Sequence, residues 1–109
     1  MNISFEEFIS RKGIVPQKIS SYELAWKIDD IKPILQWLSA NNKVVLGGDV
    51  LDVNKEYTYD NWFFENSNNL NNLEKITESA KKAKQYINCY YNNFGNEFYY
   101  VLVVEKAKT

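Results

Sequence analysis

One stretch of this sequence, residues 73–90, restricts the fold more than any other. Its apolar residues are separated by three, four, three, four and three positions, which places them on one face of a helix. They are Leu73, Ile76, Ala80, Ala83, Ile87 and Tyr90. Such a helix gains most of its stability by packing its apolar face against the rest of the protein. Residues 73–90 therefore predict a long helix that covers one side of a core.

Three segments predict the sheet that this helix covers. Residues 98–105 form an almost continuous apolar and aromatic run, which is typical of a strand in the middle of a sheet. Residues 43–46 predict a shorter buried strand. Residues 57–64 are rich in aromatic side chains and predict a strand that returns after a polar turn at residues 52–56.

A short helix is predicted near the N-terminus. Ser4 followed three residues later by Glu7 is a capping-box pattern, and the apolar residues after Ser4 have helical spacing. Gly13 is placed to end this helix, because glycine readily adopts the conformation that follows a last helical turn. Residues 5–12 are therefore expected to be helical.

A second capping-box pattern, Ser20 with Glu23, predicts a longer helix that extends to about residue 40. Its apolar residues follow at steps of four, three, four and three: Leu24, Ile28, Ile31, Leu35 and Leu38. Pro33 would remove a hydrogen bond from the helix and clash with the preceding turn. We therefore expect a kink or a break near residues 29–31, with an aspartate there as a new N-cap.

The predicted order of elements is helix, helix, strand, strand, helix, strand, which indicates an α+β fold. We expect the helices to cover one face of a small, mainly antiparallel sheet of about three strands. A chain of 109 residues is long enough for one domain with its own core, and it contains no linker or internal repeat. Residues 1–109 are therefore interpreted as a single domain.

Charge and composition exclude several classes of function. The formal net charge of −1 lacks the basic footprint of a nucleic-acid-binding protein and disfavours binding to a membrane surface. The N-terminal residues do not resemble a signal peptide, and no apolar run is long enough to span a membrane. Cys89 is the single cysteine and cannot form an internal disulfide, so we expect a cytoplasmic protein.

Histidine is absent from the sequence, and this absence removes the usual general base and the commonest transition-metal ligand. The sequence also lacks a Walker-type phosphate loop and the GxGxxG and GxSxG motifs. We therefore expect a protein that is not an enzyme and that binds no metal or cofactor.

The stretch of residues 44–62 contains the candidate functional residues. Gly47 and Gly48 follow an apolar segment and precede Asp49. Consecutive glycines indicate positive φ or a close approach by another group, so we interpret Gly47 and Gly48 as a backbone turn that breaks the strand. Residues 44–73 carry five acidic side chains and one lysine, which makes the middle of the chain an acidic patch.

Two short motifs carry a resemblance to a known family. The sequence G-G-D-V at residues 47–50 is followed by Y-D-N-W at residues 59–62, with a capped amphipathic helix before them and a long helix after them. This arrangement resembles the immunity protein 40 family of bacterial polymorphic toxin systems over residues 20–91. The resemblance implies a small cytosolic protein, encoded beside a toxin gene, that binds the toxin and neutralises it by direct contact without catalysis.

An immunity protein of this kind needs a complementary surface, and an acidic loop with aromatic anchors would steer and hold a basic toxin. We therefore hypothesise that a cognate toxin domain is the partner. The candidate partner-binding residues are Asp49, Asp52, Tyr59, Asp60, Asn61, Trp62 and Glu65. In the alternative interpretation, Asp49 accepts backbone hydrogen bonds in a local turn and Trp62 belongs to the core.

Two other functions are compatible with the sequence. The chain would need no catalytic set as a generic interaction or regulatory module. A carboxylate-based or Mg²⁺-dependent hydrolase would use Asp49, Asp52 and Asp60, because hard cations prefer oxygen ligands. The sequence does not decide between a monomer and a dimer.

Overall fold

The apolar stripe of residues 73–90 forms helix α3, Asn72–Phe94, in the computed structural model, which describes residues 3–21, 23–65 and 69–107. A reciprocal capping box begins the helix: Asn71 Oδ1 accepts from the N–H of Glu74 (2.8 Å), and Glu74 Oε1 accepts from the N–H of Asn71 (3.1 Å). The predicted stripe is largely confirmed by the burial of Ile76, Ala83, Ile87 and Tyr90. Leu73 departs from it, since it is 72% exposed.

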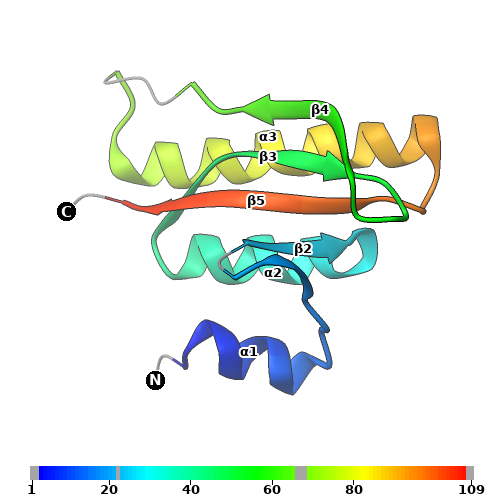
Figure 1. Cartoon of the computed structure of the whole chain (residues 1–109). Helices are drawn as coiled ribbons and strands as arrows, with labels where there is room; N and C mark the ends of the chain where they lie inside the picture. Colours follow the sequence, from blue (N-terminus) through cyan, green and yellow to red (C-terminus); the bar gives the residue numbers. More distant parts are fainter. Residues whose placement is uncertain (1–2, 22, 66–68, 108–109) are drawn as a thin grey trace.

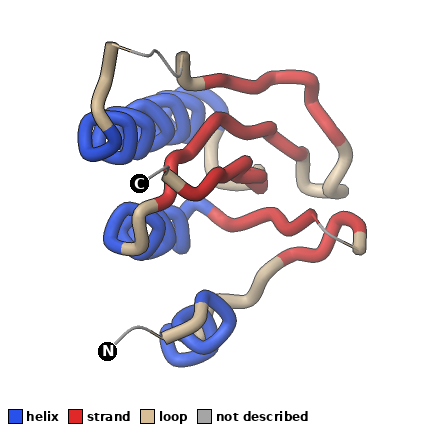
Figure 2. The backbone as a smooth tube through the Cα atoms, turned by 90° about the vertical axis from the view of Figure 1, so that its left-hand side faces the viewer, coloured by secondary structure: helices blue, strands red, loops and turns tan. Residues whose placement is uncertain are grey.

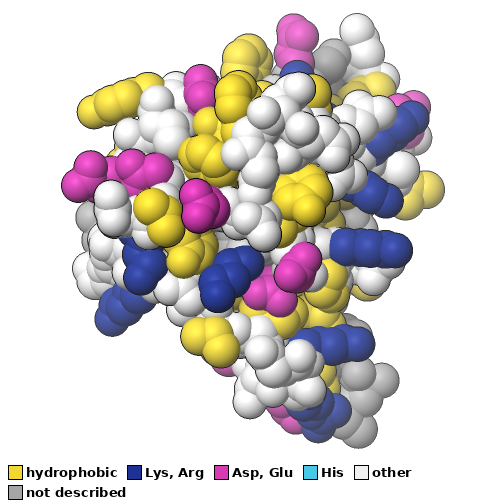
Figure 3. All heavy atoms as spheres, turned by 90° about the vertical axis from the view of Figure 1, so that its right-hand side faces the viewer, with side chains coloured by type: hydrophobic (Ala, Val, Ile, Leu, Met, Phe, Trp, Pro, Cys, Tyr) yellow, Lys and Arg dark blue, Asp and Glu magenta, His cyan; other side chains and the backbone are white. Residues whose placement is uncertain are grey.

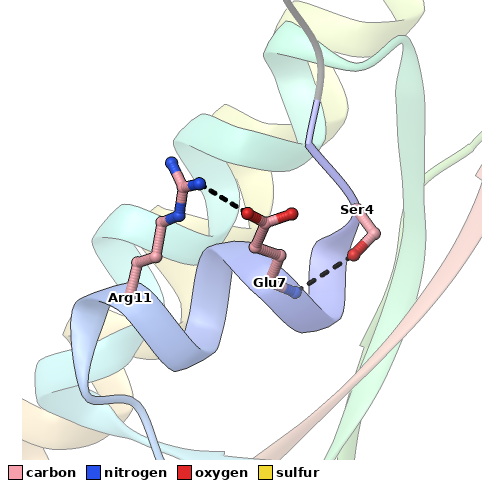
Figure 4. Close-up of polar contacts among 3 residues, drawn as sticks. All are labelled: Ser4, Glu7 and Arg11. Carbon is pink, nitrogen blue, oxygen red and sulfur yellow. Dashed lines mark hydrogen bonds and ion pairs between the residues drawn. The ribbon is translucent and has the colours of Figure 1, made fainter.

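Helix α1, Phe5–Lys12, forms as predicted. Ser4 Oγ accepts a hydrogen bond from the N–H of Glu7 (3.1 Å), as Figure 4 shows. The carboxylate of Glu7 pairs with Arg11 at 2.5 Å instead of returning to Ser4, so only half of the capping box forms. Gly13 ends the helix with φ 71°, in the left-handed conformation that glycine adopts easily.

Five strands form one antiparallel sheet in the described part of the chain, where about three were predicted. Their bounds are β1 Gln17–Ser20, β2 Glu23–Lys27, β3 Lys43–Leu51, β4 Tyr57–Phe63 and β5 Tyr99–Lys106. Across the sheet the order is β1-β2-β5-β3-β4, so β5 is central, as predicted, and β1 and β4 are edges. The order along the chain is α1-β1-β2-α2-β3-β4-α3-β5, which corrects the predicted order within the predicted α+β class.

The predicted helix start at Ser20 was wrong, because β1 ends at this residue and β2 begins three residues later. Ala25 pairs with Val101 of β5, while Trp26 is buried in the main core. Strand residues alternate between the two faces of a sheet, so β2 buries Ala25 on one face and Trp26 on the other. Pairing with β5 satisfies the backbone of this segment and outweighs the local capping-box pattern.

Helix α2, Ile28–Ala40, begins directly after β2. The break therefore lies before Ile28, and the expected break near residues 29–31 was misplaced. Pro33 lies inside α2, and Lys27 occupies the N-cap position without a side-chain hydrogen bond to the helix. The strand-to-helix change before Ile28 separates the two halves of the single helix that the apolar spacing predicted.

Helices α2 and α3 cover one face of the sheet, and no helix of the described chain covers the opposite face (Figure 2). Figure 1 views this open face, with α2 and α3 behind the strands. The main core lies between the two layers and includes Val45, Val50 and Tyr100 from the sheet. Helix α1 lies beside this core, where Phe5 packs on Trp26. None of the described helices is long and apolar enough to cross a membrane.

Candidate partner-binding surface

Gly47 and Gly48 lie inside β3, which continues to Leu51, so the predicted backbone turn at this point was wrong. The close approach that consecutive glycines indicate is nevertheless present. A Cβ on Gly48 would overlap the carbonyl oxygen of Val101 and would lie 2.8 Å from Cζ3 of Trp62. At Gly47, where φ is 155°, a Cβ would lie 2.9 Å from the Cα of Phe63. Both glycines therefore allow β3 to pack tightly between β4 and β5.

Trp62 attaches β4 to the core on the side of the sheet that faces α3. Its side chain is 6% exposed, covers Gly48 and stacks on Tyr86 of α3 with ring centroids 4.9 Å apart. Its indole N–H has no hydrogen-bond partner among the described residues. Trp62 thus lies where the alternative interpretation placed it, in the core, and the strand residues beside it face the open side of the sheet.

A bulge interrupts β4 at the Y-D-N-W motif. Asp49 pairs with Asn61 and Leu51 pairs with Tyr57, so three residues of β4 lie opposite one residue of β3. The middle residue of the three is Tyr59, which has φ 73° and is 88% exposed. A bulky residue rarely adopts positive φ, because its Cβ then crowds the backbone.

Hydrogen bonds hold this bulge in place. Thr58 Oγ1 donates to the carbonyl oxygen of Val50 (2.9 Å) and accepts from the N–H of Asp60 (3.1 Å). On the helix side, Asp60 Oδ2 accepts from the hydroxyl of Tyr90 (2.9 Å). Burial and this hydrogen bond both raise the pKa of Tyr90, so the hydroxyl stays a donor. The bulge therefore presents Tyr59 on a fixed backbone.

The open face of the sheet beside the bulge contains two rows of side chains. One row runs through Val101, Asp49 and Asn61, and the next runs through Val103, Gly47 and Phe63. Residues directly opposite each other in an antiparallel sheet share a face, so both rows lie on the side away from Trp62. Asp49 is half-buried and Asn61 is exposed.

The second row contains two exposed apolar side chains that the sequence analysis did not single out. Phe63 is 69% exposed and Val103 is 46% exposed. Lys82 of α3 reaches the edge of the sheet with its Nζ 5.5 Å from the centre of the Phe63 ring. Between the two apolar side chains lies a shallow hollow of 270 Å³ that Gly47 and Gly48 also line. We call Asp49, Tyr59, Asn61, Phe63 and Val103 the β4 surface.

A neighbouring part of the open face is covered by the chain itself. The hydroxyl of Tyr57 on β4 donates to the carboxylate of Glu23 on β2. Beneath this contact, Ala25, Leu51 and Val101 form a small buried cluster. None of these three residues lines the hollow beside Gly47, so the hollow lies outside the covered region.

Asp52 and Glu65 lie at opposite ends of β4. The predicted turn is confirmed: Asp52 Oδ1 accepts from the N–H groups of Asn54 (2.9 Å) and Glu56 (3.0 Å), and the chain then reverses into β4. Glu65 is exposed and follows the last residue of β4. Asp52 therefore closes a turn, and the predicted site residues do not gather in one place.

The carboxylates of this region do not converge. Asp49 is on the open face, Asp60 contacts α3, and Asp52 is in the turn. Across residues 3–21, 23–65 and 69–107, no three acidic or cysteine side chains lie close enough together to hold a metal ion. Figure 3, viewed from the end with the β3–β4 turn, shows acidic and hydrophobic side chains mixed on the left, the sheet side, with lysine or arginine below them, and further lysine and arginine along the right.

Comparison with known proteins identifies the family. The model of the family described as immunity protein 40 matches residues 12–104, which is most of the chain. No curated protein and no solved structure matches the chain. The matched range contains every strand of the sheet except the last two residues of β5, and it includes the whole β4 surface. The chain therefore belongs to the immunity protein 40 family.

Proposed function

We propose that this protein is a cytoplasmic immunity protein that binds a cognate bacterial toxin domain and neutralises it by direct contact, without catalysis. The β4 surface is the proposed contact surface. The observation that carries this proposal is Tyr59, an almost fully exposed aromatic side chain with φ 73°. The ring is not buried, and tyrosine disfavours positive φ. Packing and backbone conformation therefore do not explain why a tyrosine occupies this position.

The energetics of Tyr59 favour a binding role. A non-glycine residue in the left-handed region costs on the order of 1–3 kcal/mol, and such residues cluster at functional sites. An exposed ring recovers little of this cost through burial in the free protein. Tyrosine is among the side chains that most often dominate the binding energy of protein interfaces. Contact with a partner would bury the ring that the bulge leaves exposed.

The other predicted residues take different roles in the proposal. Asp49 and Asn61 contact the toxin, while Asp52, Asp60 and Glu65 add negative charge around the edge and steer a basic toxin toward it. Trp62 packs under the surface on the side that faces α3. Gly47 and Gly48 allow β3 and β4 to approach each other. Phe63 and Val103 add the apolar area that the acidic residues alone would lack.

The bulge also limits how a partner can bind. β4 is an edge strand, and a regular edge strand invites another strand to extend the sheet. A bulge disrupts the regular spacing of backbone donors and acceptors along the edge. We therefore expect the toxin to contact side chains of the β4 surface and not to add a sixth strand.

The test is co-expression with a candidate toxin. The tagged chain is produced together with the C-terminal domain that the gene immediately upstream encodes, and the purified material is analysed by size-exclusion chromatography. A one-to-one complex that also restores growth of cells producing the toxin domain is the expected result. A neighbour that is neither toxic nor bound would contradict the proposal and favour a generic interaction module.

The matched variants are Tyr59→Ala and Tyr91→Ala. Tyr91 is a partly exposed tyrosine on α3, outside the β4 surface. Loss of a central aromatic contact commonly weakens an interface by about 2 kcal/mol or more, so Tyr59→Ala should reduce affinity at least roughly 30-fold. Tyr91→Ala should bind like the parent chain. Equal affinities for the two variants would place the contact surface elsewhere.

A further inference from the structure

The hollow of the β4 surface has apolar walls and a polar end. Gly47 and Gly48 line it with backbone atoms only, because they carry no side chains, while Phe63 and Val103 stand on either side. Asp49, which follows the two glycines in β3, brings a carboxylate to the same hollow. The shape suits a long side chain that is apolar along its length and charged at its tip.

Asp49 is an unusual residue for its position. Aspartate is depleted in strands, and this one lies inside β3 with β5 on one side and β4 on the other. Its side chain is half-buried, and no described residue donates a hydrogen bond or an ion pair to its carboxylate. A carboxylate that is partly removed from water gains most from a cation that arrives with hydrogen-bond donors.

Asn61 supplies a second polar group beside Asp49. The two residues are directly opposite each other across β3 and β4. The Asn61 side-chain nitrogen donates to the carbonyl oxygen of Tyr59 (3.3 Å), which fixes the amide next to the bulge. The amide oxygen of Asn61 remains an acceptor on the same face of the sheet as the carboxylate of Asp49, so this end of the hollow offers acceptors to a donor.

We propose that the hollow receives an arginine side chain of the toxin domain. The aliphatic part of the arginine lies over Gly47 between Phe63 and Val103, and the guanidinium binds the carboxylate of Asp49 and the amide oxygen of Asn61. Arginine fits better than lysine because its planar guanidinium donates several hydrogen bonds at once and keeps its charge. This inference rests on the proposed function, since it names the partner chemistry of the same surface.

The first experiment uses the complex of this chain with the toxin domain and measures Kd by calorimetry at low and high salt. Asp49→Asn keeps the shape and removes the charge, and it should weaken binding roughly 30-fold or more. Glu105→Gln is the matched control. It also removes one negative charge, but from a residue outside the β4 surface, two positions after Val103 in β5. Glu105→Gln should change Kd less than about threefold, as expected for an exposed charge at the rim of an interface.

Stability measurements keep loss of folding separate from loss of binding. Asp49→Thr places a residue that strands favour at the same position, so this variant should melt at or above the parent temperature while it also binds weakly. An affinity for Asp49→Asn within threefold of the parent value would overturn the arginine contact. If Tyr59→Ala still weakens binding in that case, the proposed function survives. Absence of any complex with the parent chain would overturn both.

The second experiment identifies the residue of the toxin. Asp49→Arg should abolish binding by placing like charges together, and each arginine and lysine of the toxin domain is then changed singly to aspartate. Recovery of binding by one arginine variant, measured against Asp49→Arg, is the expected result. Recovery from a lysine position only, or from no basic position, would overturn the arginine contact.

Discussion

Ser79 offers a direct test of how the glycine-containing strand is held. It lies on α3, and its side chain is fully buried at 0% exposure. Ser79 Oγ accepts from the N–H of Val45 (2.9 Å) and donates to the carbonyl oxygen of Ile76 (3.2 Å). The register of β3 against β5 shifts between Val45 and Gly47, so a helix side chain pairs the backbone donor at this irregularity.

The change Ser79→Ala leaves the N–H of Val45 buried without a partner. Such a group costs about 1–3 kcal/mol, while alanine recovers roughly 0.5 kcal/mol through its higher helix propensity. We therefore expect a net loss of about 1–2 kcal/mol in the free energy of unfolding. For a domain of this size the melting temperature should fall by on the order of 5–15 °C.

The assay is urea and thermal unfolding followed by circular dichroism. Ser10→Ala is the control, because Ser10 is an exposed residue of α1 and gains the same helix propensity without losing a buried partner. Ser10→Ala should be as stable as the parent chain or slightly more stable. Equal unfolding midpoints for Ser79→Ala and Ser10→Ala would refute the reasoning, since the Val45 donor would then not depend on Ser79.

Three further outcomes follow from the same geometry. Tyr59→Gly removes the strain of the positive φ, so this variant should unfold at the same or a higher urea concentration than the parent. Its affinity for the toxin, measured by calorimetry, should fall. A loss of both stability and affinity would contradict a strained binding residue. Gly48→Ala should lower the free energy of unfolding by about 3 kcal/mol or more, or fail to fold, because its Cβ would overlap Val101 and Trp62. Gly13 has open space around it, so Gly13→Ala should lower the free energy of unfolding, measured in urea, by only about 1 kcal/mol. Burial raises the pKa of Tyr100 to about 12, so the Tyr100 hydroxyl ionises at a lower pH in the unfolded state than in the folded state. The free energy of unfolding should therefore fall as the pH rises from 10 toward 12. Tyr100→Phe should remove part of that fall, and at pH 7 it should be as stable as the parent or more stable, because the buried hydroxyl has no described hydrogen-bond partner. If the urea midpoints of the two proteins change equally with pH, Tyr100 is not the group responsible.

The sequence predicted the helices where local signals and packing agree. The stripe of α3 and the ends of α1 depend on residues close together in the chain, such as Ser4 with Glu7 and Gly13. The segment before α2 was misread because its apolar spacing fits a helix, while its actual partner is β5 at the far end of the chain. Strand pairing between distant segments leaves little trace in a local pattern.

The candidate surface was predicted in part for a similar reason. The sequence indicated a close approach at Gly47 and Gly48 but not that β3 continues through them, because the clash arises from Trp62 on another strand. Neighbouring strand residues face opposite sides, so Trp62 is buried where Phe63 is exposed. The bulge turns Asp60 toward α3, which no spacing rule would show. The assignment of Tyr59 to the toxin contact stays a prediction.

The affinity of Tyr59→Ala for the toxin domain encoded upstream, measured beside the parent chain and Tyr91→Ala, tests the central proposal most directly. The parent chain and Tyr91→Ala should form one-to-one complexes of equal Kd, and Tyr59→Ala should bind at least roughly 30-fold more weakly with an unchanged melting temperature. A parent chain that does not bind the domain, or a Tyr59→Ala variant that binds as tightly as the parent, would contradict toxin neutralisation through the β4 surface.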